Sequence, residues 1–178
     1  SCSSGAPSWA VDPAPLPAAS YPLGLASSSF IIAPGSLSPG TSYTIKLTCT
    51  EAASGLAGAA VLDVRVNLPP RGPPCSACLV QATGSTGACV KTGIAITSKF
   101  KWACAGWSDA DVPLSYRFGF SSTGGTGDVL WLSPSSREYL VAGFPSGRVT
   151  LYAAVVDSLG ASSPTQSESI VILSAAVA

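Results

Sequence analysis

The stretch Cys104-Ala-Gly-Trp-Ser-Asp-Ala-Asp-Val-Pro-Leu-Ser-Tyr-Arg-Phe-Gly-Phe120 decides the fold class of this chain. A cysteine ends one predicted strand, a tryptophan follows it, and an acidic turn containing proline leads into a second strand. Successive side chains of a strand alternate between its two faces, so Leu114, Tyr116, Phe118 and Phe120 share one face. This order of features is typical of an extracellular β-sandwich.

Composition supports an all-β protein. The chain has 178 residues, of which 47% are hydrophobic and only 10% charged. Proline or glycine interrupts nearly every window that is long enough for a helix.

With a formal net charge of +0, the chain lacks the basic face of a nucleic-acid binder and the basic amphipathic helix of a membrane-surface protein. No run approaches the roughly 18 apolar residues of a membrane span. We expect no nucleic-acid partner and no direct membrane insertion by this segment.

The chain divides at a proline-rich joint, Asn67-Leu-Pro-Pro-Arg-Gly-Pro-Pro74. We predict two tandem Ig/fibronectin-like β-sandwiches, at residues 1–68 and 69–178. The first is expected to be the C-terminal part of a fibronectin-like sandwich and incomplete at its N-terminus. A chain that starts at Ser1-Cys2 with no preceding strand is expected to be a fragment of a longer precursor.

The first block carries two strands with period-2 alternation, at residues 41–51 and 60–66. A third, short strand is predicted at residues 30–32. The spacing from Leu37 through Pro39 to Tyr43 predicts a tyrosine corner, in which the tyrosine hydroxyl bonds to upstream backbone. The residues expected to face the core of this block are Tyr43, Ile45, Leu47, Cys49, Ala60, Leu62, Val64 and Val66.

In the second block, turn signals about every ten residues predict a seven-stranded sandwich. One strand is expected to run from Ile94 to Cys104, with Ile94, Ile96, Phe100 and Trp102 in the core. The other predicted strands lie at residues 114–120, 129–132, 138–141, 149–156 and 169–173. The strongest is 149–156, where Val149, Leu151, Ala153 and Val155 share one face.

Six cysteines allow 15 pairings into disulfides. A zinc or redox site built on Cys75 and Cys78 is the alternative. A structural zinc site needs four ligands, usually as two paired hooks or with histidines, and this chain has no histidine. Disulfides are therefore favoured.

The second block resembles the receptor-for-egg-jelly (REJ) module of sperm receptors and the polycystin family. Asn67, Pro69, Pro70, Gly72 and Cys75 fit the first half of the module pattern, and the residues from Cys104 to Phe118 fit its Cys-x-Gly-Trp-x-Asp-x-Asp-x-Pro-Leu-x-Tyr core. The element Val155-Val-Asp-Ser-Leu-Gly160 is also similar to polycystic-kidney-disease repeats. Matches are dense from about residue 67 to 161. The resemblance implies tandem Ig/fibronectin-like folds on an ectodomain and no enzyme activity.

With this resemblance in view, we expect a disulfide between Cys75 and Cys104, which ties the first strand of the module to the strand before Trp107. Cys78 and Cys89, a pair that the module pattern does not contain, would then staple the loop between them. Cys2 and Cys49 would join within the first sandwich. Each bridge is expected to stabilise the fold by roughly 2–4 kcal/mol.

Asp109 and Asp111 are the candidate calcium ligands, because Ca²⁺ takes six to eight oxygens from carboxylates and carbonyls. The favoured alternative is that they cap the turn before Pro113 through their side-chain oxygens. Asp157, three residues before Gly160, is expected to be a hairpin-turn residue.

No catalytic residues and no cofactor are expected. A serine hydrolase needs a base for the serine proton, and without histidine only a Ser-Lys arrangement is left. None of Lys46, Lys91, Lys99 and Lys101 suggests one. A glycosidase needs paired carboxylates beside an aromatic groove, and no acidic residue of this chain has such flanks.

Surface candidates are aromatic or proline-linked. Of the tryptophans, Trp107 is expected in the core beside a disulfide, and Trp131 is the candidate for a ligand-facing aromatic residue. Pro7, Pro39, Pro134 and Pro164 each follow a serine and are candidate sites of hydroxylation and O-glycosylation, which would make the protein a glycoprotein. The alternative is that they are plain turn prolines.

These features predict a structural and adhesive module of a large cell-surface or ciliary-surface protein that enters the secretory pathway. Its partners would be other extracellular protein domains or copies of the same assembly. The alternative is a carbohydrate-binding module, with calcium assisting. An aromatic pair on one solvent-exposed face would favour this alternative, and burial of all four tryptophans would count against it.

Overall fold

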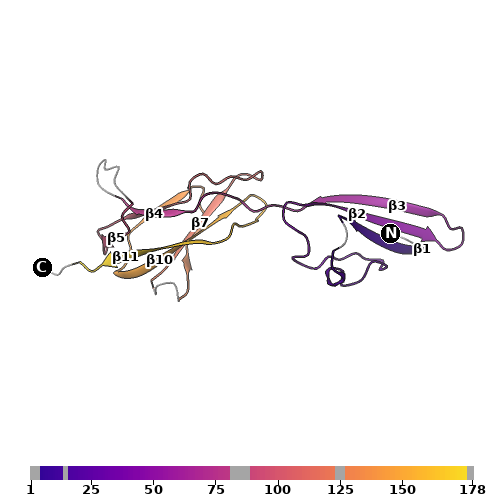
Figure 1. The fold of residues 1–178 in the computed structure, drawn as a ribbon, viewed down its shortest axis with the longest axis horizontal. Coiled ribbons are helices and arrows are strands. Elements are labelled where there is room, and N and C mark those ends of the chain that lie inside the picture. Colours follow the sequence, from indigo (N-terminus) through magenta and orange to yellow (C-terminus); the bar gives the residue numbers. More distant parts are fainter. Residues whose placement is uncertain (1–4, 14–15, 81–88, 123–126, 176–178) are drawn as a thin grey trace. The chain divides into compact units, whose positions relative to one another are not determined.

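The computed structural model describes residues 5–13, 16–80, 89–122 and 127–175. The chain is all-β and forms two compact units, Ser1–Leu68 and Pro69–Ala178 (Figure 1). Unit 1 contains strands β1 (Gly5–Asp12), β2 (Ser42–Glu51) and β3 (Ala57–Arg65) and the 3-10 helix η1 (Ala18–Ser20). Unit 2 contains β4 (Ser76–Leu79), β5 (Thr92–Ile94), β6 (Phe100–Ala103), β7 (Ser115–Ser121), β8 (Leu130–Trp131), β9 (Tyr139–Ala142), β10 (Gly147–Val156) and β11 (Gln166–Leu173).

Unit 1 is built on one antiparallel sheet in the order β1-β2-β3. The alternation of β2 places Tyr43 and Ile45 in a small core with Val11 of β1. The predicted tyrosine corner forms, because the backbone N–H of Ser38 donates to the hydroxyl oxygen of Tyr43 at 3.0 Å. This hydrogen bond lowers the pKa of Tyr43, since it stabilises the ionised oxygen.

The apolar face of this sheet is covered by irregular chain. The strand predicted at residues 30–32 is absent from the described structure, and these residues lie in a loop. Phe30 stacks on Trp9 of β1, with ring centroids 4.8 Å apart, and Leu37 packs against the same core. The apolar side chains of this segment therefore pack on the sheet as predicted for a strand, but without a backbone ladder.

Of the four residues at 60–66 expected to face the core, Val64 and Val66 pack against it, whereas Ala60 and Leu62 do not. Ala60 is exposed, and Leu62 of β3 is 60% exposed, although both alternate in phase with half-buried Val64. The covering loop packs over β1 and β2, while β3 lies at the edge of the sheet. Alternation identified the face correctly, but it cannot show how far the layer above that face extends.

Unit 2 is a sandwich of two sheets (Figure 1). The larger sheet has the order β5-β11-β10-β7-β8, and the smaller has the order β4-β6-β9. Strand β10 lies at the centre of the larger sheet, and the inward face of this strand is completely buried, as predicted. The buried side chains of β10 on this face are Val149, Leu151, Ala153 and Val155.

The strand predicted from Ile94 to Cys104 is split in two, and the two parts belong to different sheets. β5 pairs in parallel with β11, whereas β6 lies in the smaller sheet. A turn separates them, and Ile96 within it has a φ of 67°. Ile96 is 86% exposed and Ile94 47% exposed, so neither is in the core, whereas Phe100 and Trp102 are each 1% exposed. The alternation of apolar residues in the sequence therefore continues past the point where the chain leaves the larger sheet for the smaller one.

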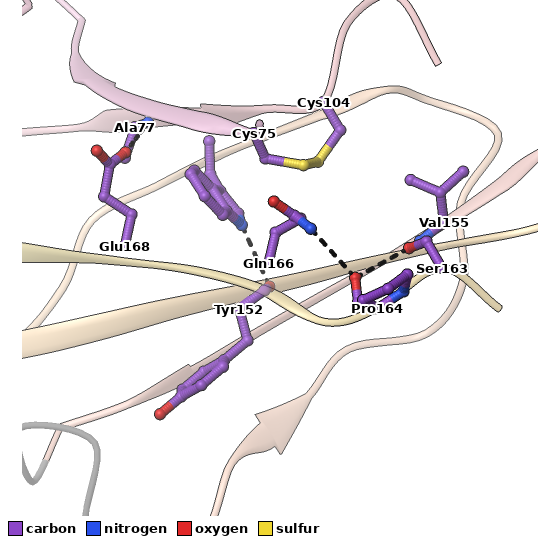
Figure 2. The surroundings of a disulfide bond; sticks show 10 residues. Cys75, Ala77, Cys104, Tyr152, Val155, Ser163, Pro164, Gln166 and Glu168 are labelled. Carbon is purple, nitrogen blue, oxygen red and sulfur yellow. Dashed lines mark hydrogen bonds between the residues drawn. A yellow bond between two sulfur atoms is a disulfide. The ribbon is translucent and has the colours of Figure 1, made fainter. Parts of the chain in front are cut away.

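Two disulfides link strands of the smaller sheet and its flank. Cys75 precedes β4 and Cys104 follows β6, and their sulfurs are bonded beside the sandwich core (Figure 2). Cys78 of β4 is bonded to Cys89. The Cys75–Cys104 bridge closes a loop of sequence separation 29, and the Cys78–Cys89 bridge one of 11.

We predict that the double substitution Cys75→Ser with Cys104→Ser lowers the free energy of unfolding of unit 2 by about 2–4 kcal/mol. The matched pair Cys78→Ser with Cys89→Ser should cost roughly 1 kcal/mol less, because loop-closure entropy grows with loop length. Urea unfolding followed by tryptophan fluorescence measures both. An equal or larger loss for the second pair would contradict this ranking.

Candidate functional site

Three aspartates meet at one end of unit 2. Asp109 and Asp111 lie in the turn after β6, and Asp157 follows β10. One carboxylate oxygen from each lies within 4.8 Å of the others. The sequence pointed to the first two as a pair, whereas the third, 46 positions after Asp111 in the printed sequence, comes beside them only because β10 ends there.

Each turn uses its own aspartate as a hydrogen-bond acceptor. The N–H of Asp111 donates to Oδ1 of Asp109 at 2.8 Å. The N–H groups of Leu159 and Ala161 both donate to Oδ1 of Asp157 at 2.9 Å. The turns are joined by the N–H of Ser158, which donates to the carbonyl of Asp111 at 3.0 Å. These bonds are those expected of turn-capping residues.

The same three carboxylates are the only group in the described part of the chain with a donor set for a metal ion. Carboxylate oxygens in a turn suit a hard cation such as Ca²⁺, which would also relieve the repulsion between the carboxylates. Three carboxylates supply fewer oxygens than the six to eight that Ca²⁺ takes. Their hydrogen bonds therefore favour the structural role.

We predict that Asp157→Ala destabilises unit 2 by about 2 kcal/mol, because two backbone N–H groups lose a charged acceptor whose side chain is buried. Asp157→Asn should cost less, since the amide oxygen still accepts these bonds. Urea unfolding with and without millimolar CaCl₂ separates the two roles. A calcium-dependent gain in stability of the wild type that Asp157→Asn removes would contradict a purely structural role.

A second candidate lies on the outward face of the larger sheet. Trp131 of β8 and Tyr152 of β10 stand in one register row with Gly119 of β7 between them. The ring centroids of Trp131 and Tyr152 are 6.4 Å apart, and the Arg117 guanidinium carbon lies 5.2 Å from the Trp131 ring centroid. In Figure 2 the Tyr152 side chain points away from the disulfide, on the other side of the strand. We call Arg117, Trp131 and Tyr152 the outer aromatic patch.

Gly119 makes room for this patch. A Cβ atom at this position would lie 3.0 Å from a ring carbon of Trp131 and 2.9 Å from a methyl group of Val129. Any larger residue would therefore displace the indole ring. The sequence singled out Trp131, but Arg117 and Tyr152 are brought to it only by strand pairing.

The other three tryptophans pack in or against the hydrophobic cores of their units. Trp102 is fully buried and its indole N–H donates to the carbonyl of Tyr152 at 3.2 Å. Trp107, expected to be the core tryptophan, is partly buried at the margin of the core and packs against Gly72, where a Cβ would lie 2.5 Å from the indole. Trp9 packs in unit 1. The strand alternation predicted Trp102 in the core correctly, whereas the position of Trp107 beside a cysteine did not show that it lies only at the margin.

The other candidate residues from the sequence are cysteines and prolines. Cys75 and Cys78 belong to different disulfides, so the zinc or redox site proposed on them is wrong. Cys49 is disulfide-bonded, and Cys2 lies outside the described residues, so their pairing stays a prediction. Pro39, Pro134 and Pro164 are exposed, whereas Pro7 is half-buried in β1. Glycosylation of these prolines also stays a prediction.

The sequence matches the REJ domain over residues 17–177. The chain belongs to the REJ domain family. The match includes both units, and so extends further upstream than the dense motifs at residues 67–161. As a REJ domain, the chain is an extracellular module of a typically non-catalytic kind, and its disulfides fit a secreted protein.

Two solved structures resemble the fold at low identity. The fibronectin(III)-like modules of CbhA from Clostridium thermocellum are 13% identical, with a TM-score of 0.44, and the alignment covers 96% of this chain and 79% of that one. The FN1–FN3 domains of chicken CNTN1 are 13% identical, with a TM-score of 0.39, and the alignment covers 96% and 56%. No curated protein matches the sequence significantly.

Among the described residues, no helix is both long and apolar enough to span a membrane.

Proposed function

We propose that this REJ domain is a structural and adhesive module of a large cell-surface or ciliary-surface protein. It acts through contacts with other extracellular protein domains or with further copies of the same assembly. The observation that carries this proposal is the exposure of β3, which has half-buried Val64 as its most enclosed residue. Leu56 just before the strand is 71% exposed, and Val61 and Leu62 in it are 61% and 60% exposed.

Exposed apolar side chains on an edge strand suit a protein partner. An edge strand offers unpaired backbone N–H and C=O groups, and an added strand can pair with them while its side chains cover apolar surface. Beside β3 lies an apolar groove of about 550 Å³, lined by Phe30, Leu47 and Leu62 among others. The formal net charge of +0 gives little general repulsion between neighbouring domains.

The proposal predicts that beads coated with the 178-residue chain bind cells that display the parent protein. Binding should be lost after the cell surface is treated with protease and should survive mild periodate, which oxidises sugars. Leu62→Ser, which removes exposed apolar surface from β3, should reduce the bead count per cell severalfold. Leu159→Ser is the matched control, because Leu159 is 69% exposed but lies in unit 2. Protease-resistant binding would contradict the proposal.

A second candidate function is carbohydrate binding at the outer aromatic patch. Trp131 and Tyr152 supply an aromatic pair on one outward face. Sugar rings stack on such aromatic faces through their C–H groups, and Arg117 and the hydroxyl of Tyr152 add hydrogen-bonding partners at the rim.

For this second function, Trp131→Ala should weaken glycan binding by about tenfold, as expected for the loss of an aromatic stacking contact. Tyr139→Ala is the matched control, because Tyr139 also carries a cation, Lys101, 4.6 Å from its ring centroid but lies in the smaller sheet. Titrations with soluble glycans followed by isothermal calorimetry measure both variants. Equal affinity for wild type and Trp131→Ala would contradict this function.

A further inference from the structure

We propose that β3 pairs antiparallel with β3 of a second copy of this chain, in the register that places Val64 opposite Val64. This inference rests on the proposed function, because it names the partner that occupies the exposed edge of unit 1. Within the described residues, β3 is an outer strand of its sheet with β2 as its only partner (Figure 1).

The hydrogen bonds at both ends of β3 show which backbone groups are directed to the free edge. The N–H of Val66 donates to the carbonyl of Thr41, and the N–H of Glu51 donates to the carbonyl of Leu56, each at 2.9 Å. In an antiparallel ladder the residues that bond to one neighbour alternate along the strand. Even-numbered positions of this strand therefore bond to β2, and Val61, Asp63 and Arg65 direct their N–H and C=O groups to the free edge.

The charges on this edge are self-complementary in one register. Asp63 and Arg65 are two positions apart and share a face of the sheet. When Val64 lies opposite Val64 of the second copy, Asp63 of each copy lies opposite Arg65 of the other. The paired edge then contains two pairs of opposite charges. An antiparallel pairing centred on Asp63 places the two aspartates opposite each other, and one centred on Arg65 places the two arginines opposite each other. A parallel in-register pairing creates both of these like-charge pairs.

The same register is consistent with the hydrogen bonding and with the apolar face. Asp63 and Arg65 are both edge-directed, so each opposite pair of them forms a hydrogen-bonded pair of the new ladder. On the other face, Leu62 lies opposite Val66 of the second copy. That contact covers Leu62, which is 60% exposed in one copy. Charged edge residues commonly protect a sheet from indiscriminate pairing, and here the two opposite charges leave one register favourable.

Sedimentation velocity of the whole chain over about 1 to 500 µM tests the proposal. The wild type is expected to show a concentration-dependent monomer–dimer equilibrium that weakens at higher salt. Asp63→Arg alone and Arg65→Asp alone each place like charges opposite each other twice, and should weaken dimerisation by about tenfold or more. Lys46→Asp is the control, because it makes the same charge change as Arg65→Asp on the same face of central strand β2.

If exchanging the charges restores dimerisation, the loss of dimerisation in the single variants is not caused by a folding defect. Mixing the two single variants pairs every charge with its opposite and should restore a heterodimer. The double variant Asp63→Arg with Arg65→Asp should restore the homodimer. A wild type that stays monomeric throughout, single variants that dimerise as Lys46→Asp does, or a mixture that stays monomeric would each overturn the proposal.

This test is separable from that of the proposed function. Protease-sensitive binding of beads to cells together with a monomeric wild type would overturn only the pairing with a second copy, leaving a different protein as the partner. Dimerisation with the predicted charge exchange but without bead binding would instead overturn the adhesive role while supporting the paired edge.

Discussion

Burial of the Trp102 side chain between the two sheets of unit 2 is the contact on which this sandwich depends. The ring is 1% exposed, and its N–H reaches across to the carbonyl of Tyr152 at the centre of the opposite sheet. The Cys75–Cys104 bridge belongs to the same core. In a chain with only 10% charged residues and much alanine, glycine and serine, few side chains are large enough to fill the space between two sheets. A large buried aromatic ring and a nearby covalent link therefore provide much of the packing.

Unit 1 covers the apolar face of its sheet in a different way. Its sheet has no second sheet over it among the described residues, and the apolar face of β1 and β2 is covered by a loop in which Phe30 stacks on Trp9. The loop leaves most of β3 exposed. The apolar side chains and backbone groups left on that edge are the surface that we propose for a protein partner. The candidate sites of unit 2, the aspartate turns and the outer aromatic patch, lie outside its filled core.

Local pattern predicted the strands well wherever one strand stays in one sheet. The alternation in β2, β7 and β10 identified their buried faces correctly, because period-2 spacing and the pleat of a strand are the same geometric fact. It failed at Ile94 and Ile96, where the apolar spacing continues while the chain changes sheets, and at Leu62, where the pattern is correct but no layer covers it. The aspartate cluster was found in part: Asp109 and Asp111 are neighbours in sequence, whereas Asp157 joins them through the end of β10.

The sequence by itself determined the all-β class, the division at the proline-rich joint, the tyrosine corner at Tyr43 and the membership of the REJ family. These depend on local spacing, on proline and glycine, or on motifs that are contiguous in the chain. Only the tertiary structure decided which side chains from distant strands meet, such as Trp131 with Tyr152, and which apolar residues stay uncovered, such as Leu62. The physical reason is that period-2 alternation specifies the face of a strand, whereas strand order and the extent of the covering layer depend on contacts between residues far apart in the chain.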